Sequence, residues 1–278
     1  MIQDIGEHTF DNQYHPCPPD RESYALYYED HAALVRKYPD RIEFPKFRDI
    51  ERLNEDIYED AVYLFSIDGE RYYLVEEINR ERQSHFTMEN TEIFRYAEPQ
   101  YLAFAGITGY QLHNWYQSRR FCGKCGRRMK KDSKERMLYC ESCHNMEFPK
   151  ICPAVIVGVT KGDEILLTRY AGRTYKKYAL LAGFTEIGET LEETVQREVM
   201  EEVGLKVKNI RYYKSQPWSF TDTLLMGFYC DLDGGAAITL DREELAMAEW
   251  FQRDEIPVEP ERDSITNEMI IRFKNGEV

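Results

Sequence analysis

The chain has 278 residues, of which 42% are hydrophobic, so it is long enough for two modest domains with ordinary cores. Its 50 acidic and 36 basic side chains give a formal net charge of −14, which argues against a protein that coats nucleic acid by general basic charge but allows a local basic patch. The N-terminal sequence MIQDIGEHTFDNQY lacks the basic and apolar segments of a secretory signal, and no apolar run approaches the roughly 20 residues of a membrane span.

The N-terminal region, residues 1–95, is rich in tyrosine and acidic side chains and carries no repeat. Residues 61–66 and 71–75 alternate in polarity on either side of Asp68 and Gly69, which predicts a β-hairpin. Residues 30–38 have a weak helical spacing of apolar side chains, which predicts a short helix.

A longer helix is predicted at residues 100–119, where Leu102, Leu112 and Trp115 share an apolar side. We therefore expect a small α+β domain at residues 1–118.

Four cysteines follow in two CxxC pairs, Cys122 with Cys125 and Cys140 with Cys143, separated by fourteen residues. Two such pairs can close tetrahedrally on a zinc ion and leave no open ligand position. This spacing predicts a structural zinc ribbon at residues 119–147. A ribbon without its metal and a redox dithiol are the alternatives, although a redox dithiol needs only one pair. Free cysteines in metal spacing favour a reducing cytoplasm.

The predicted ribbon is locally basic. Two interpretations stay open: a patch that binds phosphate groups, and the solvated surface of a domain too small to bury much. The cationic side chains concerned are Arg119, Arg120, Lys124, Arg127, Arg128, Lys130, Lys131, Lys134 and Arg136.

Residues 148–278 show the regular alternation of strands and helices that is typical of an α/β domain. A final helix is predicted at residues 264–273. The predicted strands are residues 151–160, 164–170, 178–182, 210–214, 224–230 and 249–252.

The most informative stretch is Gly183–Leu205, which predicts a tight loop followed by an acidic helix. Thr190 and Glu193 have the spacing of a capping box, which starts a helix. Three glutamates then occupy one face, where their mutual repulsion costs a few tenths of a kcal/mol per pair unless a divalent cation offsets it. They are Glu198, Glu201 and Glu202. A solvated acidic face is the plain alternative.

The stretch resembles the signature of the Nudix hydrolases at Gly183, at Glu189 and along the run REVMEEVGL that ends at Leu205. Ser215, Gln216, Pro217 and Trp218 then resemble the SQPWPFPxS array of the NADH pyrophosphatase branch of that family. The resemblance covers residues 115–252. It departs from the array at Ser219, Thr221 and Thr223, and the two missing prolines could change the shape of what we expect to be a loop.

The resemblance implies a Nudix α/β/α sandwich with a mixed sheet, preceded by the four-cysteine ribbon and the small α+β domain. It implies metal-dependent hydrolysis of NAD(H) to nicotinamide mononucleotide and AMP, and the same chemistry could remove NAD caps from RNA. It also implies a homodimer, whereas the lack of a long apolar run is what predicts that the protein does not engage a membrane. Mg²⁺ or Mn²⁺ would be held by Gly183, Glu198, Glu201, Glu202 and Glu244, and the four glutamates would be the catalytic residues.

Recognition of the substrate would fall to aromatic and polar side chains. Phe184 matches a family position that stacks on a ring of the substrate, and Phe148 matches an aromatic contributed to the partner subunit's pocket. Ser215 and Gln216 could hydrogen-bond the nucleotide, and Arg197 would orient the glutamates. Two alternatives remain: a Nudix hydrolase that prefers ADP-ribose or dinucleoside polyphosphates, and a non-catalytic nucleotide- or RNA-binding module.

Overall fold

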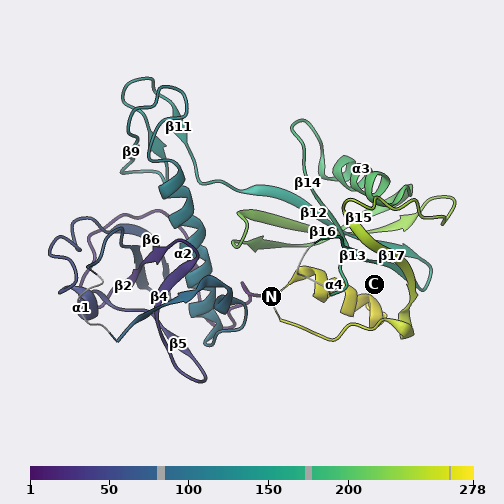
Figure 1. Cartoon of the computed structure of the whole chain (residues 1–278), viewed down its shortest axis with the longest axis horizontal. Coiled ribbons are helices and arrows are strands. Elements are labelled where there is room, and N and C mark those ends of the chain that lie inside the picture. Colours follow the sequence, from purple (N-terminus) through teal and green to yellow (C-terminus); the bar gives the residue numbers. More distant parts are fainter. Residues whose placement is uncertain (80–84, 173–176, 263) are drawn as a thin grey trace. The chain divides into compact units, whose positions relative to one another are not determined.

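The computed structural model describes residues 1–79, 85–172, 177–262 and 264–278 (Figure 1). Its contacts divide the chain into two compact units. One contains residues 2–150 and 219–221, and the other contains residues 151–218 and 222–278 with Met1. No helix in the described ranges is long and apolar enough to cross a membrane. The predicted boundaries at residues 118 and 147 stay a prediction.

The N-terminal unit holds two small sheets and one long helix. The first sheet has the order β1 (Phe10–Asp11), β6 (Val62–Ile67), β7 (Glu70–Leu74) and β2 (Tyr24–Leu26). The second joins β3 (Tyr28–Glu29), β4 (Ala32–Lys37) and β5 (Ile42–Glu43), with β8 (Thr87–Asn90) paired to β4. The helical elements are α1 (Phe47–Ile50), η1 (Thr91–Arg95) and α2 (Gln100–Ser118).

Two predictions for this unit have opposite outcomes. The hairpin is confirmed, because β6 and β7 pair across Asp68 and Gly69, both at positive φ. The helix predicted at residues 30–38 is wrong, because the segment forms β4 between β3 and β8. Leu34 packs in one core cluster whereas Ala33 and Val35 pack in another, so the apolar run has the two-residue period of a strand.

The ribbon contributes three very short strands, β9 (Lys130–Lys131), β10 (Leu138–Tyr139) and β11 (Met146–Glu147), in one antiparallel sheet. Cys122, Cys140 and Met129 pack into the same core cluster as α2. The ribbon is therefore a continuation of the N-terminal core.

The second unit is built on a mixed sheet. Its order is β15 (Val207–Trp218), β16 (Thr223–Leu232), β12 (Cys152–Lys161), β13 (Glu164–Tyr170) and β17 (Leu245–Gln252). β14 (Leu181–Phe184) also pairs with β12, the β12–β16 pair is parallel, and the other pairs are antiparallel. The helical elements are α3 (Leu191–Val203), η2 (Arg253–Glu255) and α4 (Ile265–Lys274).

Strand alternation separates the two cores of this unit. Val155 and Val157 of β12 pack with α3, whereas Ile156 between them packs with α4. The two helices consequently cover opposite faces of the sheet (Figure 1). This arrangement confirms the predicted α/β/α sandwich with a mixed sheet. The strand predicted at residues 178–182 begins later, at Leu181.

Candidate active site and zinc ribbon

Helix α3 begins and ends as its sequence predicts. The Thr190 hydroxyl accepts a bond from the Glu193 backbone N–H at 3.2 Å, and the Glu193 carboxylate accepts one from the Thr190 N–H at 2.8 Å. The helix ends at Gly204, which has a φ of 69°. A Cβ at Gly204 would also lie 2.9 Å from the Thr239 Cβ, so glycine is required there.

Gly183 leaves room for a carboxylate. It lies on β14 opposite Val155 of β12, directly beside the Glu198 side chain of α3. A Cβ on Gly183 would sit 1.9 Å from the Glu198 carboxyl carbon, a distance that no side chain can adopt. Gly183 and Glu198 both belong to the Nudix signature at residues 183–205, hereafter the Nudix box. The Glu198 side chain can therefore occupy its position only because residue 183 has no side chain.

Arg197 ties the acidic groups of the box together. Its Nη1 donates to Glu198 at 2.8 Å and to Glu201 at 2.9 Å, while its Nε and Nη2 donate to both oxygens of Glu189 at 2.6 and 2.9 Å. Its Nη2 also donates to the Phe184 carbonyl at 2.9 Å. The hydrogen bonds to Glu198 and Glu201 agree with the expectation that Arg197 orients the glutamates, and its lack of contact with the substrate stays a prediction.

Glu189 holds the loop that precedes α3. Its carboxylate accepts bonds from Arg197, from the Glu186 backbone N–H and from the Thr194 hydroxyl. The bonds from Arg197 and from the Glu186 N–H lower the pKa of the Glu189 carboxyl to about 2. The sequence did not predict that the fully buried Thr194 would donate a hydrogen bond to Glu189, because a single hydroxyl in a helix gives no sequence signal.

The four predicted catalytic glutamates differ in exposure. Glu198 and Glu202 are buried at 8% and 2% exposure, whereas Glu201 and Glu244 are open to solvent. Burial raises the pKa of the Glu198 carboxyl; Arg197 opposes this rise, and the charges of Glu201 and Glu244 add to it. That effect places Glu244, from a loop more than forty residues downstream, within electrostatic reach of Glu198.

Main-chain bonds fix the loop that carries Glu244. The Thr239 and Asp241 N–H groups donate to the carbonyls of Val203 and Glu202, each at 2.9 Å. The Glu244 carbonyl accepts a bond from the Ala171 N–H at 2.8 Å, at the end of β13. These backbone contacts have no side-chain signature, so sequence spacing could suggest Glu244 but could not locate it.

The predicted substrate-binding residues have different settings. The Phe184 ring is 57% exposed and the Phe148 ring is 54% exposed, which leaves both free to stack. Ser215 is partly buried. Gln216 is fully buried, and its amide oxygen accepts a 2.7 Å bond from the Ile265 N–H at the start of α4. Direct contact between Gln216 and a nucleotide stays a prediction.

The array from Ser215 to Trp218 is not a loop. It forms the end of β15, paired residue by residue with Thr223–Met226 of β16. The expectation of a loop is wrong for residues 215–218, where the ladder continues through Pro217, and right for residues 219–222, which form the turn. The replaced prolines fall in that turn.

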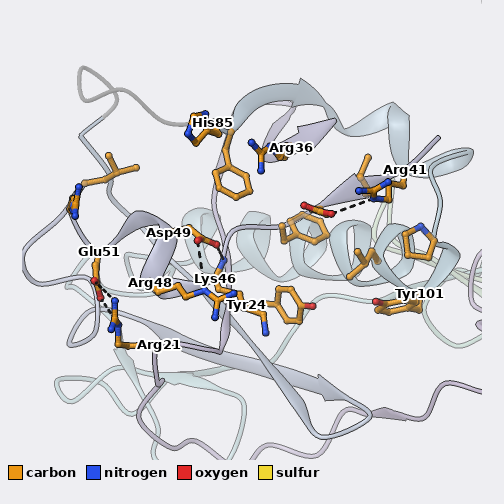
Figure 2. A pocket seen from close by; sticks show the side chains of 18 residues that line it. Arg21, Tyr24, Arg36, Arg41, Lys46, Arg48, Asp49, Glu51, His85 and Tyr101 are labelled. Atoms are coloured by element: carbon orange, nitrogen blue, oxygen red, sulfur yellow. Dashed lines mark hydrogen bonds and ion pairs between the residues drawn. The ribbon is translucent and has the colours of Figure 1, made fainter. Parts of the chain in front are cut away.

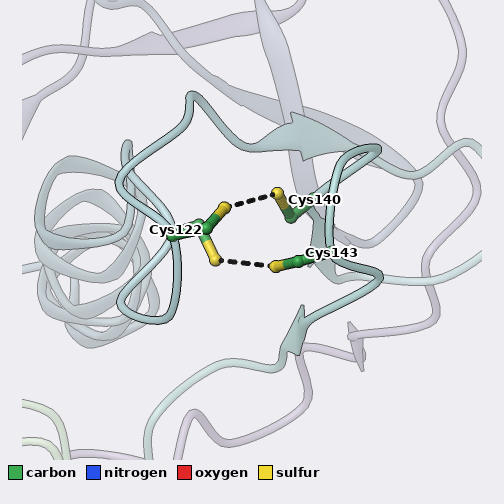
Figure 3. A group of neighbouring side chains, drawn as sticks. Cys122, Cys140 and Cys143 are labelled. Carbon is green, nitrogen blue, oxygen red and sulfur yellow. Dashed lines mark hydrogen bonds between the residues drawn. The ribbon is translucent and has the colours of Figure 1, made fainter.

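The four cysteines form a compact cluster in the N-terminal unit (Figure 3). Their Sγ atoms all lie within 4.8 Å of one another, with 3.5 Å between Cys122 and Cys143 and 3.4 Å between Cys125 and Cys140. Ligands about 2.3 Å from one tetrahedral zinc ion would lie about 3.8 Å apart. Backbone N–H groups of Cys143 and Ser142 lower the pKa of Cys140 to about 7, which favours the thiolate. The donor set and spacing fit a structural zinc ion.

Several cations around the ribbon are already paired. Lys130 contacts Glu141 at 2.7 Å, Lys131 contacts Glu76 at 3.1 Å, and Arg136 is largely covered. Lys124, Arg127 and Arg128 remain exposed, with no ion pair to any residue within the described ranges. The basic surface of the ribbon is therefore narrower than the sequence suggests.

Comparisons with known proteins agree with this geometry. The NUDIX domain profile matches residues 150–273, and the NADH pyrophosphatase zinc ribbon domain profile matches residues 117–148. A protein of Photorhabdus laumondii named NAD-capped RNA hydrolase NudC is 43% identical over 162 residues, which are 58% of this chain and 63% of that protein. A solved Nudix hydrolase of Nitrosomonas europaea is 23% identical and covers 56% of this chain and 90% of its own, with a TM-score of 0.49.

The chain thus spans less than two thirds of the first relatives that it matches. A longer match joins it to the protein named NAD-capped RNA hydrolase NudC of Mannheimia succiniciproducens, with 37% identity over 212 residues. That match covers 73% of this chain and 78% of the relative. The chain belongs to the NADH pyrophosphatase branch of the Nudix hydrolase family, which carries a zinc ribbon ahead of its Nudix domain.

Proposed function

We propose that this protein hydrolyses the pyrophosphate of NAD(H) to nicotinamide mononucleotide and AMP, and that it removes NAD caps from RNA. The observation that carries the proposal is the close contact between Gly183 and Glu198, held by Arg197 beside Glu201. An arrangement of buried and exposed carboxylates around one arginine suits an active site that must bind a cation and a diphosphate. The relatives named as NAD-capped RNA hydrolases support this choice of substrate over ADP-ribose or dinucleoside polyphosphates.

The residues present fit a hard divalent cation such as Mg²⁺ or Mn²⁺, which prefers oxygen ligands. The ligands would come from the Gly183 carbonyl and from Glu198, Glu201, Glu202 and Glu244. The raised pKa of the Glu198 carboxyl supports this fit, because burial and the charges of Glu201 and Glu244 outweigh the effect of Arg197, so a further positive charge would stabilise the carboxylate. When bound, the cation supplies charge that offsets the diphosphate and lowers the pKa of water.

The chain's own groups would orient the substrate and move a proton. Glu201 or Glu202 would accept a proton from the attacking water, with Glu244 as a further catalytic carboxylate on the facing loop. Arg197 would keep Glu198 and Glu201 in place rather than touch the substrate, since its donors already bond to protein oxygens. Glu189 would anchor the loop.

The exposed Phe184 ring would stack on a ring of the dinucleotide, and Ser215 and Gln216 would hydrogen-bond it. Phe148 would complete the partner subunit's pocket in a homodimer, which the exposed ring permits. We place the protein in the cytoplasm, where a zinc ribbon of free thiolates is compatible with the reducing conditions.

A product-resolved assay tests the proposal. Wild-type protein with Mg²⁺ or Mn²⁺ should release AMP and nicotinamide mononucleotide from NADH, and faster than it turns over ADP-ribose. Glu202→Gln should lose about 10²- to 10⁴-fold in rate, the range of acid–base groups. The matched control is Glu192→Gln, an exposed carboxylate on the same helix, which should keep full activity. Intact NADH after incubation, or equal background rates in wild type and Glu202→Gln, would refute catalysis.

Cap removal needs a separate test with NAD-capped RNA. Charge reversal at Arg127, Arg128, Lys130 and Lys131 should slow the turnover of capped RNA more than the turnover of free NADH. Equal effects on both substrates would remove the ribbon from RNA recognition while leaving the hydrolysis of NADH intact.

A further inference from the structure

A cavity lies in the N-terminal unit, entirely within residues 21–102, and none of its lining residues belongs to the Nudix box or the ribbon (Figure 2). Its volume is about 760 Å³, within the range of small-molecule sites. Six cationic side chains line it against three carboxylates, Glu43, Asp49 and Glu51. The cations are Arg21, Arg36, Arg41, Lys46, Arg48 and Arg52. Such a concentration of positive charge is notable in a chain of net charge −14.

The β4–β5 hairpin brings two of these cations together. Its turn is closed by the Tyr38 N–H, which donates to the Arg41 carbonyl at 2.8 Å. The guanidinium groups of Arg36 and Arg41 lie 5.5 and 4.2 Å from the centre of the Tyr38 ring. Both guanidinium groups also line the cavity, so an anion bound in the cavity would reduce the repulsion between these two positive charges.

The carboxylates nearby compensate only part of this charge. The Glu43 carboxylate accepts hydrogen bonds from the Arg41 Nε at 3.3 Å and from the Tyr38 hydroxyl at 3.0 Å. Lys46 and Arg48 share Glu22, and Arg21 pairs with Glu51. Arg36 stands directly across the strand pair from Glu43 but makes no ion pair with any residue that the structure describes. Among the described residues, the positive charge of Arg36 is therefore not balanced by an ion pair.

Aromatic and apolar side chains complete the cavity. Phe44 and Leu102 are buried in its wall, Tyr24 and Tyr101 are partly exposed, and the Lys46 ammonium lies 5.1 Å from the centre of the Tyr24 ring (Figure 2). The Tyr24 ring is braced by stacking on Tyr72 at 4.6 Å between centroids. Burial raises the pKa of Tyr24 to about 12, so its hydroxyl remains a neutral donor. Cations beside braced aromatic rings are the features that bind phosphate groups and bases.

We propose that this cavity binds a nucleoside phosphate, with the phosphate on Arg36, Arg41 and Lys46 and the base against Tyr24 and Tyr101. The ligand is either a free nucleotide or a nucleotide unit of an RNA chain, since the recognised chemistry is the same. Binding here requires no hydrolysis, so the proposal is independent of the activity of the Nudix domain.

The test measures binding by the full chain carrying Glu202→Gln, so that turnover does not remove the probe. The probes are ADP, 5′-phosphorylated pentaadenylate without a cap, and inorganic triphosphate. We expect Arg36→Ala to weaken the binding of ADP or of the oligonucleotide by about tenfold or more. Tyr101→Leu should weaken those two probes but leave inorganic triphosphate unchanged.

Lys37→Ala is the matched control, because Lys37 is the next residue of β4, pairs with Glu89 and does not line the cavity. It should bind all probes as the parent does. Thermal midpoints of the variants check that each is folded. The relative affinities of ADP and the oligonucleotide identify the source of the ligand. Equal affinity of parent and Arg36→Ala, an equal loss in Lys37→Ala, or binding of triphosphate alone would overturn the proposal.

Discussion

The zinc ribbon and the Nudix box at residues 183–205 are the two places where we expect a metal ion, yet their donor atoms are arranged differently. In the ribbon, four Sγ atoms already lie within 4.8 Å of one another, and backbone N–H groups favour the thiolate of Cys140. In the box, a guanidinium group lies among the carboxylates, and burial raises the pKa of the Glu198 carboxyl. The ribbon is a closed site, whereas the carboxylates of the box are held apart.

This difference follows from what each site must do. A structural site gains stability when every ligand position is filled by the protein, whereas a catalytic site needs positions for water and substrate. Arg197 keeps the carboxylates in fixed places without closing them on one point. The predictions below test this contrast, starting with the largest expected effect.

Removing one zinc ligand should damage the ribbon most. Zinc binding contributes about 10–16 kcal/mol to the folding of small zinc domains, so Cys140→Ala should lose the metal and the ribbon's order. Zinc content and hydrogen exchange of residues 119–147 measure this. The control is Cys152→Ala, a partly buried cysteine outside the cluster. A Cys140→Ala protein with full zinc and full protection would mean that the ribbon is not a closed site.

Adding a single methyl group at Gly183 should abolish most of the catalytic activity. Gly183→Ala places a Cβ 1.9 Å from the Glu198 carboxyl carbon, so the carboxylate must move by more than 1 Å. We expect a loss of about 10²-fold in kcat/KM for NADH, with little change in zinc content. Gly235→Ala is the control, because its Cβ would meet nothing within 4 Å. Unchanged activity in Gly183→Ala would show that Glu198 need not occupy its observed position.

Replacing the Arg197 guanidinium group should lower kcat/KM by less than Gly183→Ala does. Lysine keeps the charge but cannot bond Glu189, Glu198 and Glu201 together, so Arg197→Lys should lower kcat/KM by about tenfold. The loss should shrink at high Mg²⁺ concentration if the arginine acts by positioning ligands. The control is Arg211→Lys, which changes an arginine of β15 that pairs with Asp231. It should leave kcat/KM and its dependence on Mg²⁺ concentration as in wild type. An equal loss at every Mg²⁺ concentration would contradict a positioning role.

As the pH falls, we expect the ribbon to lose its zinc before the Glu189 carboxylate of the Nudix box is protonated. Protons compete with zinc for thiolates, so the ribbon should release zinc as the pH falls. The pKa of Glu189 is depressed to about 2, so its bond to Arg197 contributes stability above the unfolded pKa of about 4.3 and loses it only as the pH falls through about 2. A chromophoric chelator follows zinc, and NMR titration follows the Glu189 carboxyl. Titration of the Glu189 carboxyl near its ordinary pKa would contradict the hydrogen bonds from Arg197 and the Glu186 N–H that hold this carboxylate.

Short-range signals predicted the parts of the molecule that depend on neighbouring residues. The capping box of Thr190 and Glu193 located the start of α3, and the CxxC spacing located the cysteine cluster. Residues 30–38 were misread because pairing with β3 and β8 overrides a weak helical pattern. Residues 215–218 were misread as part of a loop, because the pairing of a strand with β16 cannot be seen in a motif.

Long-range contacts could not be predicted from spacing. The position of Glu244 depends on backbone bonds to the end of α3, and any side chain could make them. The basic cavity gathers residues between Arg21 and Leu102 that share no motif. Only the folded chain brings such residues to one place.

The bonds from Thr239 and Asp241 to the end of α3 also divide the connection between β16 and β17 into two segments with different tolerance for added length. Extra residues inserted near Gly234 and Gly235, where a side chain would meet nothing within 4 Å, can loop outward before the first bond is reached. Extra residues between Asp241 and Glu244 would shift the carboxylate itself. Natural or engineered insertions that preserve activity should therefore accumulate in the first segment and be absent from the second.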